Sequence, residues 1–114
     1  MCWPSGRRLP AAESVVQSHY AEHFERDMGC TEAEWLGWLS AALGDHAWQR
    51  DGARVEVRIG PGSLRIAWQS APPRVLGSVR IPRLLAGFSF TGLDERQRYT
   101  FMKRFDLYMQ RGGG

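Results

Sequence analysis

The sequence lacks the features on which several classes of protein depend. Its 114 residues include only two cysteines, Cys2 and Cys30, which are too few for a disulfide framework. No stretch approaches the roughly 18 consecutive apolar residues that a membrane-spanning helix requires. Arg7 and Arg8 are not followed by the apolar segment of a secretory signal. We therefore expect a soluble, cytoplasmic protein with two unpaired thiols.

Motifs for catalysis and cofactor binding are missing as well. The sequence contains no G-x-S-x-G elbow, no G-x-G-x-x-G loop and no P-loop. His19 and His23 are four residues apart, the spacing at which two imidazoles on a helix can share a metal ion. Cys30 and His46 are the candidates for a third ligand, but neither has a diagnostic spacing. We expect no cofactor and no metal site, and a small enzyme or a metal-binding protein is a minor alternative.

Lysine is nearly absent, since Lys103 is the only lysine among 15 cationic residues. A GC-rich coding sequence produces the same bias toward arginine, so the bias by itself says little about function. The placement of charge is more informative. Residues 1–50 carry four cationic and seven acidic residues, whereas residues 51–114 carry eleven and five. Such asymmetry is typical of proteins with an anionic partner, although ordinary surface charge explains it too.

The residues that are present suffice for one hydrophobic core. A chain of 114 residues with 43% hydrophobic residues fits a single domain. Pro4, Gly6 and Pro10 predict a flexible N-terminal arm over residues 1–10. We expect a single α+β domain over residues 11–111 and a flexible glycine tail over residues 112–114.

Residues 11–44 predict two helices joined by a tight turn, that is, an αα-hairpin. The first helix covers residues 11–29, where apolar residues recur at every fourth position. These residues are Val16, Tyr20, Phe24 and Met28. Thr31 and Glu34 have the spacing of a capping box and begin the second helix, which Gly44 ends.

From Gly52 onward the apolar residues alternate with polar ones, as in strands with one buried face. Residues 53–60 and 63–69 show this pattern on either side of a turn at 60–62. Pro72 and Pro73 place the next break in a loop or at a sheet edge. Residues 75–90 predict a third strand with a bulge near Pro82. The pattern predicts a three-stranded antiparallel meander.

Residues 91–111 predict a final helix that begins at Asp94. It carries an apolar stripe of five residues: Phe101, Met102, Phe105, Tyr108 and Met109. A stripe of this kind packs into the core. The predicted fold is therefore α+β in the order α-α-β-β-β-α, with the C-terminal helix packed on the sheet in two layers.

The leading functional interpretation is a non-enzymatic binding module that contacts a protein partner or a second copy of itself. The free edges of a small sheet favour pairing with another chain, which makes a homodimer through a sheet edge one form of this hypothesis. Aromatic residues are common at protein interfaces. The candidate interface residues are Trp35, Trp38 and Trp48.

The alternative hypothesis is weak, sequence-independent binding of nucleic acid. If the apolar strand residues face the helices, arginines gather on the opposite face of the sheet and can hold phosphates. The candidate residues are Arg54, Arg58, Arg65, Arg80 and Arg83. That face offers no clear aromatic residue, so the base-stacking pattern of RNA-reading sheets is missing.

Overall fold

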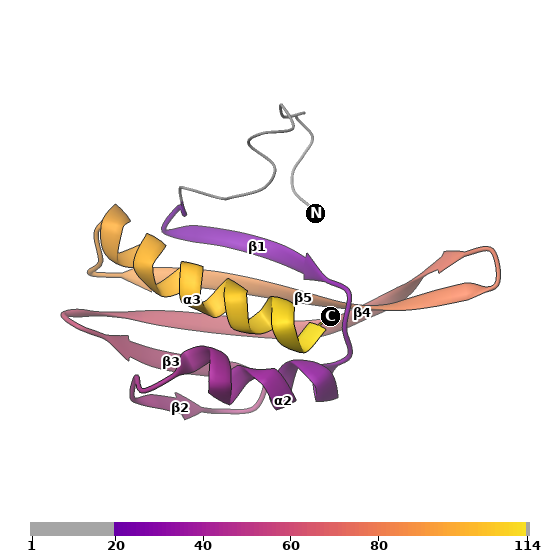
Figure 1. Ribbon diagram of the computed structural model, residues 1–114, viewed down its shortest axis with the longest axis horizontal. Coiled ribbons are helices and arrows are strands. Elements are labelled where there is room, and N and C mark those ends of the chain that lie inside the picture. Colours follow the sequence, from indigo (N-terminus) through magenta and orange to yellow (C-terminus); the bar gives the residue numbers. More distant parts are fainter. Residues whose placement is uncertain (1–19, 114) are drawn as a thin grey trace.

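The computed structural model describes residues 20–113, with side chains as far as Gln110. The predicted N-terminal arm, residues 11–19 of the predicted first helix, and Gly114 lie outside this range. The described residues form a five-stranded antiparallel sheet with two helices lying across one of its faces (Figure 1). Neither helix in this range has an apolar stretch of membrane-spanning length.

The first and last strands of the chain are neighbours in the sheet. The sheet order is β1-β5-β4-β3-β2, and all neighbouring strands are antiparallel. The segment that follows β1 passes across the end of the sheet to α2, which lies along the side formed by β3 and β2, and α3 then runs back over the same face (Figure 1). The elements are β1 (His23–Met28), α2 (Glu32–Leu43), β2 (Trp48–Arg50), β3 (Arg54–Ile59), β4 (Gly62–Leu76), β5 (Val79–Thr91) and α3 (Glu95–Gly113).

The predicted N-terminal αα-hairpin is wrong, because residues 23–28 form β1 and not the end of a helix. The prediction relied on apolar residues four positions apart, and that spacing fits both one helical turn and two repeats of a strand. Arg26 separates the two cases, since it lies between Phe24 and Met28 on the side of β1 that faces the helices. Asp106 of α3 binds Arg26 there. This contact with a residue far away in the sequence allows the charged Arg26 to lie on the covered side of a strand.

The predicted three-stranded meander is also wrong, because β1 and β2 extend the sheet on both sides. β1 pairs with β5 from His23 opposite Ser89 to Met28 opposite Leu84. β2 pairs with β3 at the other edge. It has only three residues, too few to show an alternating pattern in the sequence. The three strands that the sequence predicted form the centre of the sheet.

Two prolines predicted to end the second strand lie inside β4 instead. Pro72 and Pro73 lie opposite Pro82 of β5, and the register of the hairpin shifts at this position. β3 pairs with β4 only as far as Ala67, and β1 pairs with β5 only as far as Leu84. The prolines are tolerated because this part of the hairpin is two-stranded and has free edges.

Both helices begin at the residues that the sequence predicted. The Thr31 hydroxyl accepts a hydrogen bond from the Glu34 amide at 3.1 Å, and the Glu34 carboxylate accepts one from the Thr31 amide. Asp94 and Gln97 form the same reciprocal pair at the start of α3. These pairs satisfy amides that have no partner within the helix.

The core lies between the helices and the sheet. The predicted stripe of α3 is confirmed, since Phe101, Met102, Phe105 and Met109 are buried and Tyr108 packs against the core. Phe105 meets Trp35 of α2 and Phe88 of β5 edge to face. The other face of the sheet, which we call the open face, is not covered by any described helix (Figure 1).

Candidate functional site

The β4–β5 hairpin continues past the rest of the sheet, and we call its residues 72–82 the hairpin extension. Figure 1 shows it as a two-stranded projection at one end of the molecule. Its last pair is Leu76 opposite Val79. Gly77 closes the turn with a φ of 62°, in the left-handed region that a two-residue hairpin loop requires. Apart from the register shift at Pro72 and Pro73, the extension is therefore a paired two-stranded hairpin as far as its tip.

Apolar side chains gather at the tip of the hairpin extension. Val75, Leu76 and Val79 are 55%, 58% and 56% exposed. In the described part of the chain, the other exposed large apolar residues are Trp48 and Leu107, which lie on separate elements. Neighbouring apolar side chains that remain in water are typical of a contact surface.

Three of the five predicted anion-binding arginines lie together on the open face. Arg54 and Arg58 come from β3, and Arg65 comes from the adjacent strand β4. Their side chains form no hydrogen bond or ion pair with another described residue. Glu56 lies directly opposite Arg65 and between the other two along β3. The cluster is therefore basic but contains one acidic side chain.

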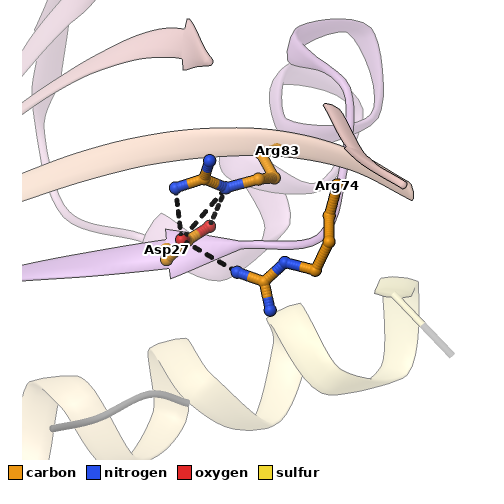
Figure 2. A network of polar contacts seen from close by, with 3 residues as sticks. All are labelled: Asp27, Arg74 and Arg83. Atoms are coloured by element: carbon orange, nitrogen blue, oxygen red, sulfur yellow. Dashed lines mark hydrogen bonds and ion pairs between the residues drawn. The ribbon is translucent and has the colours of Figure 1, made fainter. Parts of the chain in front are cut away.

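Arg83 lies on the open face but is already bound (Figure 2). Its Nη2 donates to Asp27 Oδ2 at 2.7 Å, and its Nε donates to the same carboxylate at 3.1 Å. Arg74 of the hairpin extension approaches that carboxylate to 3.5 Å. The hydrogen bonds from Arg83 are the main reason that the pKa of Asp27 lies below its usual value. Arg83 therefore links β5 to β1, and its charge is compensated.

Arg80 is the predicted arginine that the structure separates most clearly from the others. The prediction had Val79 and Ile81 facing the helices, which would place Arg80 on the open face. In the structure it belongs to the hairpin extension. It lines a shallow hollow of about 400 Å³ with Thr31 and Glu32 at the start of α2. The five arginines therefore do not form one surface.

A row of four residues crosses most of the open face, from the edge strand β1 to β3: Glu25 of β1, Gly87 of β5, Ala67 of β4 and Arg54 of β3. Gly87 has no side chain and Ala67 has only a methyl group, so the surface is depressed in the middle of the row. The floor and walls of this shallow hollow include His23, Glu25, Arg65, Ala67, Gly87 and Ser89. Acidic and basic groups thus stand on opposite sides of a depression.

The three predicted interface tryptophans have different environments. Trp35 is completely buried against Trp68 and Phe105, so it cannot contact a partner. Trp38 is half-buried against the core. Trp48 is 38% exposed on the edge strand β2. Only Trp48 therefore presents a substantial part of its ring to solvent.

A polar cluster on the covered face has a structural explanation. Asp106 of α3 accepts a hydrogen bond from Tyr20 Oη at 2.7 Å and two from the Arg26 guanidinium. Burial, followed by the Asp106 hydrogen bond, raises the pKa of the Tyr20 hydroxyl. Arg26 also lies over the rings of Phe24 and Phe88. The cluster attaches β1 to α3, and its groups are mutually satisfied.

Among the described residues, those considered for metal binding and thiol chemistry, namely His23, Cys30 and His46, do not form a site. His19 lies outside the described residues, and His23 lies on the open face of β1. Within residues 20–113 no three side chains of His, Cys, Asp or Glu gather as a metal site would require. Cys30 is 2% exposed, and burial raises the pKa of its thiol to about 11. A thiol with these properties is a poor nucleophile.

The apolar tip of the hairpin extension is the feature that the sequence prediction missed. The signal was present in the dipeptide Gly77-Ser78, which suits a two-residue hairpin loop, together with the alternation on either side of it. Pro72 and Pro73 concealed it, because they suggested that the strand had ended. No family model, curated protein or solved structure matches this chain.

Proposed function

We propose that this protein is a non-enzymatic module that binds another protein through the hairpin extension. The observation that carries the proposal is the exposure of Val75, Leu76 and Val79, each more than half exposed at one tip. The partner surface that suits them is an apolar groove or pocket, because only burial removes these side chains from water.

The hairpin extension is suited to entering such a groove. Its backbone is paired up to Leu76 and Val79, so little order has to be gained on binding. Three prolines at its base, Pro72, Pro73 and Pro82, restrict the backbone further. Arg74 and Arg80 flank the tip and supply polar contacts at the rim of an interface.

The test replaces Val75, Leu76 and Val79 together with serine. The wild-type chain and the triple variant are used to capture partners, and the affinity for each purified partner is then measured. We expect the triple variant to bind at least tenfold more weakly, a loss of about 1.4 kcal/mol, which is modest for three apolar contacts.

Leu107→Ser is the matched control, because Leu107 is also an exposed apolar residue but lies on α3. The control is expected to retain full affinity. Partners that bind the triple serine variant as tightly as the wild-type chain would contradict the proposal, as would capture that depends equally on Leu107.

A second candidate function is the binding of nucleic acid by the open face. The observation that favours it is that Arg54, Arg58 and Arg65 have no acidic partner within hydrogen-bonding distance among the described residues. Arg54 and Arg58 are four residues apart on one strand, roughly 13 Å. Such a spacing allows contacts with separate phosphates, without base readout.

Titration with short single-stranded and double-stranded oligonucleotides at several salt concentrations tests this second function. Each phosphate contact is expected to contribute a slope of about −0.7 to −0.9 to the logarithm of affinity against the logarithm of salt. Replacing Arg54, Arg58 and Arg65 with glutamine should abolish binding, while Arg80→Gln should not. Binding that survives the triple replacement would exclude the open face as the contact.

A further inference from the structure

The open face has opposite charges at its two sides and small residues between them. Glu25 on β1 and Arg54 on β3 end the row that passes through Gly87 and Ala67. Neither the Glu25 nor the Arg54 side chain forms an ion pair or a hydrogen bond within the described residues. The row therefore has an acidic side chain at one end, a basic side chain at the other and two small residues between them, and neither charged side chain has a partner among the described residues.

We propose that the open face binds the open face of a second copy of this chain, with a two-fold axis parallel to the strands. Such an axis places β1 over β3 and β5 over β4 of the second copy. Glu25 of each copy then faces Arg54 of the other, so the interface contains the pair twice. Gly87 and Ala67 face each other at the centre, where their small size permits close approach of the two sheets.

The next row of the face is complementary under the same axis. His23, Ser89, Arg65 and Glu56 lie side by side across β1, β5, β4 and β3. The axis places His23 opposite Glu56 of the second copy and Ser89 opposite Arg65. Every one of these contacts joins a donor with an acceptor. Arg65 of one copy also reaches the depression next to Ser89 of the other.

The charges disfavour the other in-plane two-fold axis where it passes through this row. An axis perpendicular to the strands at this row would place β1 over β1, with Glu25 against Glu25 and Arg54 against Arg54. Like charges facing each other oppose association. Aligned packing with a small angle between the strand directions is also a common arrangement for two stacked sheets. Aligned packing therefore agrees with the two-fold axis parallel to the strands.

This inference uses different residues from the proposed binding by the hairpin extension, although the extensions of the two copies lie at the same end of the proposed dimer because they continue β4 and β5. The extension begins beyond the last rows that involve β1 and β3. Charge reversal at Glu25 and Arg54 therefore tests the dimer without changing Val75, Leu76 or Val79. Failure of either proposal leaves the other standing.

The test is charge reversal followed by sedimentation equilibrium on the full chain at low salt. Glu25→Arg and Arg54→Glu are each expected to weaken the dimer at least tenfold. The double variant should recover the wild-type dissociation constant, because each reversed charge meets a reversed partner. An equimolar mixture of the two single variants should also form dimers, since one chain then carries two arginines at these positions and the other carries two glutamates.

Arg96→Glu is the control, because Arg96 is an exposed cation on α3 and its reversal changes the net charge by the same amount as Arg54→Glu. This control should dimerise like the wild-type chain. A wild-type chain that sediments as a monomer at every concentration overturns the proposal. A dimer that tolerates Arg54→Glu also overturns it, because association then uses a sheet edge or another surface.

Discussion

Asp27 shows how the pKa of one side chain depends on its neighbours in the fold. Its carboxylate accepts hydrogen bonds from Arg83, which hold its pKa below the usual value of 3.8. A lowered pKa in the folded state means that the ionised carboxylate adds stability above about pH 4, and that this stability is lost as the pH falls through the lowered pKa.

Asp27→Asn is therefore expected to matter most near neutral pH. The difference in thermal midpoint between the wild-type chain and Asp27→Asn should be largest at pH 7 and should shrink below pH 4. Circular dichroism melts between pH 7 and pH 2 measure this difference. A constant difference across the whole range would show that the pair with Arg83 does not control the titration of Asp27.

Phe105 tests the role of the final helix, also at the scale of one residue. It is fully buried and contacts aromatic rings of α2 and β5. Phe105→Ala is expected to lower the free energy of unfolding by about 3–5 kcal/mol. Leu107→Ala on the same helix removes a side chain that is 48% exposed and should change it by less than about 0.5 kcal/mol. Chemical denaturation compares the two, and similar small losses would mean that α3 is not docked.

At the scale of the element, Gly62 and Gly37 differ in whether the structure leaves room for a side chain. A Cβ atom on Gly62, where β4 begins, would lie 2.2 Å from the carbonyl oxygen of Thr91, and backbone atoms cannot yield as a side chain can. A Cβ atom on Gly37 of α2 would meet nothing within 4 Å. Glycine is therefore required at the first position and is only a weak helix former at the second.

Alanine replacements at these positions should shift stability in opposite directions. We expect Gly62→Ala to destabilise the protein by about 1–3 kcal/mol through overpacking. Gly37→Ala should stabilise it by about 0.5–1 kcal/mol, because alanine favours the helix and restricts the unfolded chain. Urea denaturation of both variants provides the measurement. A neutral Gly62→Ala would mean that the β4–β5 pair opens easily at this end.

At the scale of the whole molecule, the hairpin extension contributes little to the core. Its strands pair with no described strand other than each other, and its apolar tip is exposed. Its described ionic contact with the sheet is the pair of Arg74 with Asp27, whose Arg74 side chain is 57% exposed. Exposed pairs of this kind are worth at most about 1 kcal/mol.

Replacing residues 72–82 with Asn-Gly joins Ala71 to Arg83, which are already paired, by a two-residue turn. The shortened chain should keep its cooperative unfolding, with a midpoint within about 5 °C of the wild type. Differential scanning calorimetry provides the comparison. Loss of the transition would show that the extension belongs to the folding unit, and the proposed binding role would then be hard to separate from stability.

The sequence by itself determined the elements whose signals are local. Capping pairs at Thr31 and Asp94, the stripe of α3 and the alternation of β3 and early β4 all depend on residues within a few positions of one another. Such patterns constrain the backbone directly, because a helix or strand fixes which neighbours share a face. For this reason the two helices and the central strands could be predicted.

Only the tertiary structure decided the features that depend on distant residues. Residues 23–28 became a strand because β5 pairs with them and because Asp106, 80 positions away, binds Arg26. Arg83 does not contribute a free charge to the basic cluster, because it binds Asp27, 56 positions away. Trp35 is buried because aromatic rings from β4 and α3 pack against it. Periodicity assigns a residue to a face, but it does not say which partner the residue meets there. That partner depends on how the elements pack, which local patterns do not encode.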